Sequence, residues 1–374
     1  MATNTLDHSS TDDSTQEKDS TEQIIIRESP DLWLKDGNLI IRTVSKDSPP
    51  THTLYKVHKH ILALHCSVFA SLFDGPHDAL DLGSEHRDGV PVMDLSDDAD
   101  DVRDFLKALY FSKETHRHSP PTAPGRRNVF PLSYHGILRL AAKFDAQDLR
   151  DLLVPLLKAD WPSVLDEWEA LQDAASEQPW NEGGALDCTA AHPRSAVNTI
   201  LLATECAVPD VLPAAFYELA SAADFFPSDP FRAQVLSNAA KLSARQLFAM
   251  VAGRASIRGF VATAVIGHEI DAVISPACAT RRRRLLTPCR EYMAKWWDTQ
   301  RSEAFYASDS LGWLRQTRDN CDKMVEEDVC PACIAWTKDF LVTTREALWR
   351  ELPRFFDLKD EVSPNWGSPG PAST

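Results

Sequence analysis

The fold is decided by two neighbouring blocks of sequence, YKVHKHILA at Tyr55–Ala63 and SVFASLF at Ser67–Phe73. The first block begins in a strand-like run that ends at Val57. From Ile61 onward, apolar residues recur three or four positions apart, which is the spacing of one face of a helix. The two blocks therefore predict a strand that passes directly into a pair of helices.

The residues before these blocks predict further strands. Ile24–Ile26, Leu32–Leu34 and Leu39–Ile41 are short apolar runs separated by polar residues. Asp36-Gly37 lies between the last two runs and favours a tight turn. We therefore expect those two strands to form a hairpin.

The residues after the blocks predict one more strand, followed by helices. Val90–Leu95 is strand-like, and Ser96-Asp97-Asp98 is a favourable helix start because negative charge stabilises a helix N-terminus. Apolar residues then recur at helical spacing within 102–110, 137–144 and 149–157.

Beyond Asp160 the strand patterns stop, and seven segments with helical periodicity follow. They are 161–176, 194–206, 210–225, 231–254, 256–275, 283–307 and 311–351.

The chain is therefore expected to have four parts. Residues 1–22 carry six acidic residues against one lysine, which predicts a disordered acidic tail. Residues 23–158 are expected to form an α/β domain, a short sheet covered by helices. An all-α helical domain follows at 159–358, and 359–374 is expected to be a flexible C-terminal tail.

Four further segments carry a specific resemblance when they are taken together with the two opening blocks. They are Asp31–Leu34, Asn38–Ile41, Val92–Asp98 and Phe105–Tyr110. At this spacing, residues 31–157 resemble a BTB/POZ domain of the fungal type, in which a long helical region follows the domain. The resemblance implies an α/β BTB/POZ fold and a non-enzymatic protein–protein interaction module.

Members of this family homodimerise, bring substrates to cullin-type ubiquitin ligases or recruit transcriptional corepressors. The resemblance therefore implies a homodimer and an adaptor, with other proteins, a cullin among them, as candidate partners. The cullin-binding type often carries a hydrophobic-x-Glu motif before the last strand. Here Glu85 has Gly83 two places before it, so the motif is absent as written.

Three residues of this region are candidate interaction residues. Asp31 matches the position of an acidic residue that BTB domains place near their dimer interface, and the alternative is a turn residue before a strand. His58 and Lys59 lie where the strand becomes a helix. A histidine at such a junction is more often a hydrogen-bonding structural residue than a catalytic base.

The cysteines of the C-terminal half are the main candidate metal ligands. Cys330-Pro331-Ala332-Cys333 would supply half of a tetrahedral zinc site, and Cys278 with Cys289, or Cys321 with His268, would supply the other half. Because this spacing does not match a common zinc ribbon, ordinary thiols without a cofactor are favoured over a structural zinc site. A redox pair is less favoured, since the acidic residues before Cys330 would raise a thiol pKa.

Two other function classes remain as alternatives. The basic run Arg281–Arg284 would serve nuclear import of a transcriptional co-regulator, or it is a solvated helix turn. A zinc- or thiol-dependent enzyme of the C-terminal half is the second alternative. The chain has no G-x-S-x-G, no phosphate-binding glycine loop and no H-E-x-x-H motif, so no enzymatic activity is expected.

Composition narrows the cellular setting. The 55 acidic residues outnumber the 39 basic ones, for a formal charge of −16, which argues against binding to a nucleic-acid backbone. No apolar stretch approaches the ~18 residues of a membrane span. The N-terminus lacks the basic and apolar regions of a secretory signal, and the eight cysteines are interpreted as reduced thiols. We therefore expect a cytoplasmic or nuclear protein that is not secreted and does not bind membranes.

Overall fold

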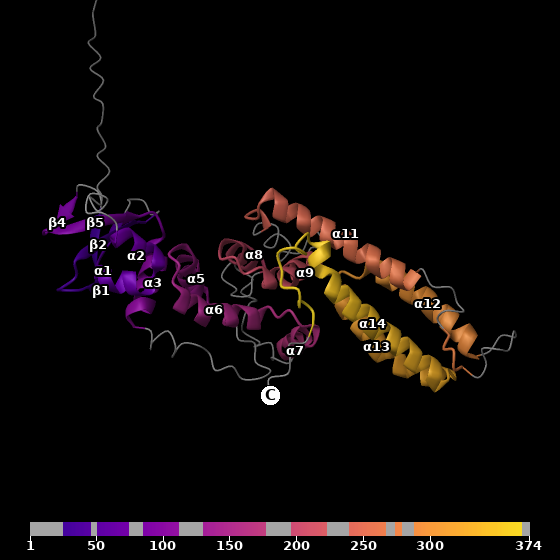
Figure 1. The fold of residues 1–374 in the computed structure, drawn as a ribbon. Helices are drawn as coiled ribbons and strands as arrows, with labels where there is room; N and C mark the ends of the chain where they lie inside the picture. Colours follow the sequence, from indigo (N-terminus) through magenta and orange to yellow (C-terminus); the bar gives the residue numbers. More distant parts are fainter. Residues whose placement is uncertain are drawn as a thin grey trace, which may run out of the picture. The chain divides into compact units, whose positions relative to one another are not determined.

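The computed structural model describes residues 25–45, 51–74, 85–111, 130–176, 196–222, 239–266, 274–278 and 288–368 (Figure 1). The predicted acidic tail, Gly83, His268 and the basic run Arg281–Arg284 lie outside these residues.

The described residues divide into two compact units. The first contains 25–59 and 85–103, and the second contains 60–74 together with the residues from 104 onward. The chain is thus a mixed sheet with helices followed by a long run of helices, which agrees with an α/β region followed by an all-α region.

The first unit is built on a five-stranded sheet with the order β1-β3-β2-β5-β4. Its strands are β1 (Ile25–Trp33), β2 (Leu39–Val44), β3 (Thr51–Val57), β4 (His86–Arg87) and β5 (Val90–Leu95). β2 runs antiparallel to β3 and parallel to β5, while β1 runs parallel to β3. Ile40, Leu54 and Val92 form a buried cluster at the centre of this sheet, and Trp33 and Val90 pack against it.

The predicted hairpin between β1 and β2 is wrong, because β3 lies between these strands. The chain does turn at Asp36-Gly37, and the turn is tied to the end of β3. The N–H of Leu34 donates to the carbonyl oxygen of Lys56 at 3.0 Å. A Cβ on Gly37 would lie 2.8 Å from Cγ of Lys56 and 3.0 Å from its carbonyl carbon. Gly37 therefore permits the close approach of β3 to the turn, and the turn does not pair the strands that it joins.

The helices follow the predicted periodicity closely in the first half of the chain. They are α1 (Lys59–His65), α2 (Ser67–Phe73), α3 (Ala99–Tyr110), α5 (Leu132–Lys143), α6 (Gln147–Asp160), α7 (Leu165–Ser176), α8 (Ala196–Glu205), the 3₁₀ helix η2 (Pro209–Val211), α9 (Leu212–Ala222), α11 (Ala244–Ile266), α12 (Pro288–Tyr306), α13 (Ser310–Asn320), the 3₁₀ helix η3 (Cys321–Glu327) and α14 (Pro331–Phe355).

The C-terminal helices differ from the prediction in where they break. α11 runs through the predicted interruption at 254–256 without a break. The predicted segment 311–351 is instead divided into α13, η3 and α14, because the chain reverses at Asp328, whose φ of 57° lies in the left-handed region. α14 packs against both α13 and α11, and α11 also packs against α12 and α9 (Figure 1).

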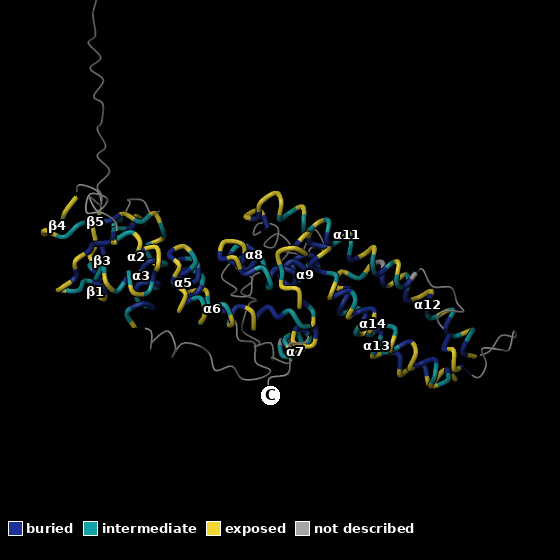
Figure 2. The backbone as a smooth tube through the Cα atoms, viewed as in Figure 1, coloured by how far each residue is buried: buried dark blue, intermediate teal, exposed yellow. Residues whose placement is uncertain are grey.

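By length and composition alone, the stretch Ala244–Val265 of α11 is apolar enough to cross a membrane. The expectation that no stretch of this kind exists is therefore wrong. Exposed positions recur along this helix (Figure 2), and they include Phe248 and Val251. The buried core helix of a soluble protein passes the same test, so the composition assigns no membrane location to α11.

Two glycines of α11 allow a matched test of its packing. A Cβ on Gly253 would lie 2.1 Å from Cδ1 of Phe356, a buried ring that stacks on Phe216 at 5.4 Å. A Cβ on Gly259 would meet nothing within 4 Å. We expect Gly253→Ala to lower the free energy of unfolding by about 1–3 kcal/mol through overpacking. Gly259→Ala should raise it by up to ~1 kcal/mol through helix propensity. Urea unfolding of both variants measures the difference, and equal effects would contradict the packing.

Candidate metal centre

Four cysteines of the second unit meet at one place. The sulfur atoms of Cys278, Cys289, Cys330 and Cys333 all lie within 4.8 Å of one another. The Sγ atoms of Cys278 and Cys330 are 3.7 Å apart, and none of the four forms a disulfide. Cys330 is half-buried and the other three are buried. The structure thus brings the C-x-x-C pair together with Cys278 and Cys289, one of the two alternative pairs that the sequence predicts.

Short turns at the ends of helices position these cysteines. Cys330 is the N-cap residue of α14 and Pro331 occupies the first turn, so the helix begins inside the C-x-x-C pair. The N–H of Cys333 donates to the carbonyl oxygen of Cys330 at 3.0 Å, which folds the pair back on itself. Cys289 lies in the first turn of α12, and Cys278 ends a tight turn in which its N–H donates to the carbonyl oxygen of Ser275.

Burial controls the protonation of these thiols. It raises the pKa of Cys333 far above its ordinary value, and a hydrogen bond from the backbone of Ser275 opposes this only in part. Burial also raises the pKa of Cys289, although the N–H of Cys330 donates to its Sγ at 3.3 Å. Without a cation the two groups are therefore neutral thiols at pH 7. A bound divalent metal ion would favour their thiolate forms and release protons.

The other predicted cysteine ligand lies elsewhere. Cys321 is buried at the start of η3, and its Sγ bonds the carbonyl oxygen of Thr317 at 3.3 Å. Burial raises the pKa of Cys321 to about 11, so it is an inert structural thiol.

The candidate interaction residues lie in the first unit, on strand β1 and at the junction between β3 and α1. Asp31 is exposed on β1, which is an edge strand. His58 Nε2 is 3.2 Å from Asp36 Oδ1. A backbone hydrogen bond and this histidine lower the pKa of Asp36. The N–H of Lys59 donates to Asn38 Oδ1 at 2.8 Å, so the start of α1 is capped from the β1–β2 turn.

Glu85, the acidic residue of the incomplete cullin motif, is paired with an arginine of the sheet. Arg42 on β2 donates through Nη1 to Glu85 Oε1 at 2.8 Å and through Nη2 to Asp94 Oδ2 at 2.8 Å. Hydrogen bonding to Asp94 raises the pKa of Arg42, and burial opposes it. Arg42 and Asp94 are partners in the parallel β2–β5 register, so this network bridges the two strands.

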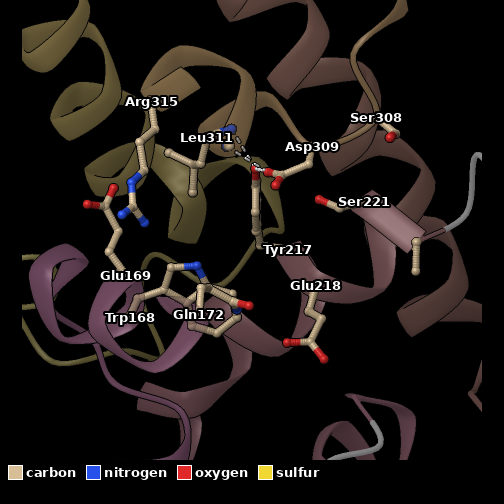
Figure 3. Close-up of a pocket in the computed structure, with 12 residues that line it drawn as sticks. Trp168, Glu169, Gln172, Tyr217, Glu218, Ser221, Ser308, Asp309, Leu311 and Arg315 are labelled. Carbon is tan, nitrogen blue, oxygen red and sulfur yellow. Dashed lines mark hydrogen bonds between the residues drawn. The ribbon is translucent and has the colours of Figure 1, made fainter. Parts of the chain in front are cut away.

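A cavity of about 360 Å³ lies among the helices of the second unit (Figure 3). No local sequence pattern indicates this cavity, because its residues come from α7, α9 and the start of α13, far apart in the chain. The lining residues are Trp168, Glu169, Gln172, Tyr217, Glu218, Ser221, Ala222, Ser308, Asp309, Leu311, Gly312 and Arg315.

Two polar residues of this cavity, Tyr217 and Asp309, cap the start of α13. Tyr217 donates through its hydroxyl to Asp309 Oδ1 at 2.6 Å and accepts from the N–H of Leu311 at 2.8 Å (Figure 3). Asp309 also accepts from the N–H of Gly312 at 3.0 Å, which makes it the N-cap residue of α13. Burial, followed by the charge of Asp309, holds the pKa of Tyr217 well above 10. A tyrosine that stays protonated and saturated in this way is a structural group rather than a base.

No protein-family model, curated protein or solved structure matches the chain.

Proposed function

We propose that this chain is a non-enzymatic protein–protein interaction protein of the BTB/POZ type, which dimerises through its sheet and holds one structural zinc ion in its helical part. The order of elements supports the first half of this proposal. Strands β1 to β3, the helix pair α1–α2, strands β4 and β5, and helices α3, α5 and α6 follow one another as the resemblance implies.

The proposal of a dimer rests on β1, which lies at the edge of the sheet. Among the described residues β1 pairs with β3 alone, and Ile25 and Ile26 near its start are 39% and 57% exposed. An exposed edge with apolar side chains is a template for pairing with another chain. Asp31 is exposed on the same strand, where the resemblance implies the dimer interface. A second copy of the chain is therefore the first partner.

The expected result for the full chain is a dimer in size-exclusion chromatography with light scattering. Ile25→Lys together with Ile26→Lys should give a monomer, because two charges on the edge oppose strand pairing. Val44→Lys is the matched control. Val44 is similarly exposed, at 45%, but lies on β2, which has a neighbour on each side. The proposal would be contradicted by a monomeric wild-type chain, or by a double variant that still forms a dimer.

The environment of Glu85 narrows the range of partner proteins other than a second copy of the chain. Its carboxylate is held by Arg42, and Gly83 occupies the apolar position of the cullin motif. These features favour an adaptor whose partner is not a cullin. A transcriptional co-regulator stays a candidate, and it depends on import by Arg281–Arg284, which lie outside the described residues.

The cysteine cluster carries the zinc proposal. A tetrahedral ion with Zn–S bonds of about 2.3 Å separates its sulfur ligands by about 3.8 Å, close to the 3.7 Å between Cys278 and Cys330. Four thiolates fill a tetrahedral shell and leave no position for a substrate, which is the pattern of a structural site and not a catalytic one. The N–H groups of Cys330 and Ser275 directed at Cys289 and Cys333 are the outer-shell donors that such sites use.

Elemental analysis of the purified chain tests this directly. We expect one zinc ion per chain, retained by Cys321→Ser and lost by Cys330→Ser. Cobalt substitution should give the visible absorption of a tetrahedral thiolate-bound ion. An absence of metal, or iron in place of zinc, would overturn the assignment.

A further inference from the structure

The segment Phe356–Ser368, here called the C-terminal strap, follows α14, and its second half is bonded to Asp210 of η2. Ser363 donates to the carboxylate of Asp210 twice, from its N–H to Oδ1 and from its hydroxyl to Oδ2, each at 2.8 Å. The indole N–H of Trp366 donates to the carbonyl oxygen of Asp210 at 2.9 Å. Trp366 is buried and stacks on Trp349 with ring centroids 5.1 Å apart. Residues 359–368 of this strap belong to the segment 359–374 whose sequence predicts a flexible tail.

Asp210 holds the strap as a carboxylate. Lys158 Nζ lies 2.7 Å from Asp210 Oδ2. Burial alone would raise the pKa of Asp210, but the hydrogen bonds from Lys158 and Ser363 outweigh it and lower the pKa. The strap is therefore fastened by a serine that donates into an anion, with one lysine to balance the charge.

Ser363 is also the most suitable phosphate acceptor among the described serines that precede a proline. Ser363 and Pro364 are both exposed and lie outside any helix. Ser29 and Ser275 also precede prolines, but both are buried at 5% exposure. Ser368 precedes a proline and is exposed, and its N–H bonds the carbonyl oxygen of Asn365.

We propose that Ser363 is a phosphorylation site for a proline-directed protein kinase, and that the phosphate opens the C-terminal strap. ATP supplies the γ-phosphoryl group. The serine oxygen forms the new P–O bond, the bond between the γ-phosphorus and the β–γ bridging oxygen breaks, and ADP and the hydroxyl proton are released. The product carries a charge of about −1.5 to −2 at pH 7.

This charge turns the attraction between Ser363 and Asp210, which fastens the strap, into a repulsion. The modified oxygen no longer donates to Asp210, and the new phosphate dianion faces the carboxylate of Asp210, which is already paired with Lys158. Like charges at this distance repel, and salt screens the repulsion only in part, because the side chain of Asp210 is 16% exposed. The strap then leaves η2, and Trp366 leaves the face of Trp349. The modification thus exposes an aromatic surface that the unmodified chain covers.

The test installs phosphoserine at position 363 of the full chain and follows backbone hydrogen exchange. We expect the amides of Ser363 and Trp366, which bond to Asp210 and to the carbonyl oxygen of Ser363, to exchange at least tenfold faster. Phosphoserine at position 368 is the matched control and should leave both amides unchanged. In an Asp210→Asn chain, phosphoserine 363 should add a smaller increase, because one of the two repelling charges is gone.

Two results would overturn the proposal. The first is phosphoserine 363 with exchange rates equal to those of the unmodified chain. The second is a full chain that proline-directed kinases with ATP modify at Ser368 but leave unmodified at Ser363. Both measurements are independent of dimerisation and of zinc content.

Discussion

Replacement of Cys333 by serine should release the metal ion and lower the free energy of unfolding of the helical part by about 3 kcal/mol or more, since zinc binding free energy is folding free energy in sites of this kind. Cys333 is fully buried at the start of α14. Its ion would join this helix to the first turn of α12 and to the turn that ends at Cys278. Loss of one ligand therefore frees three segments of the chain at once.

Urea unfolding with and without a chelator measures this effect. The chelator should lower the stability of the wild-type chain to that of Cys333→Ser and should leave the variant itself unchanged. Cys321→Ser is the matched control, because Cys321 is equally buried but lies outside the cluster. It should respond to the chelator as the wild type does. A chelator effect of equal size in Cys333→Ser would show that the stabilising ion is bound elsewhere.

Arg345→Met should strongly destabilise the packing of α14, although it leaves the volume of the side chain nearly unchanged. Arg345 is 5% exposed, and its Nε lies 2.9 Å from Oε1 of Glu169. The N–H is not aimed at the carboxylate, so the contact is an ion pair without a hydrogen bond, and Nη1 has no hydrogen-bond partner in the described part of the chain. Removal of one partner of a buried pair costs about 3–5 kcal/mol, because the other charge stays buried and unpaired.

The double variant Arg345→Met with Glu169→Gln separates this cause from lost packing. It should recover most of the loss, since an imperfectly bonded buried pair contributes little net stability. Burial already raises the pKa of Glu169, and the loss of Arg345 raises it further. A group whose folded pKa is raised stabilises the fold below its unfolded pKa and loses that stabilisation as pH rises. The deficit of Arg345→Met should therefore shrink between pH 7 and pH 4, and a deficit independent of pH would point to packing.

Local patterns predicted the elements well and their pairing less well. The change of spacing after Val57 placed the junction between β3 and α1, and Val90–Leu95 became β5 as predicted. Asp36-Gly37 predicted a turn, and the structure confirms that the chain turns there. It could not reveal that β3 is inserted between the strands that the turn joins, because strand order depends on contacts distant in sequence.

The candidate site shows the same limit. The C-x-x-C pair is a local signal, and the sequence could name its two members. It could not choose between Cys278 with Cys289 and Cys321 with His268, because that choice depends on how α12 and η3 pack against the start of α14. Asp210 carried no signal at all, since its contacts to Ser363 and Trp366 span more than half of the helical part.

The spread of the four cysteines also sets the order in which the protein matures. Cys278 and Cys289 leave the ribosome well before Cys333, which lies near the C-terminal end of the chain. Because N-terminal parts fold first during synthesis, the sheet is complete while the cluster still lacks half of its ligands. Metal capture then waits for the synthesis of Cys333, and a chain released before that residue would keep its N-terminal fold while α12 lacks its anchor.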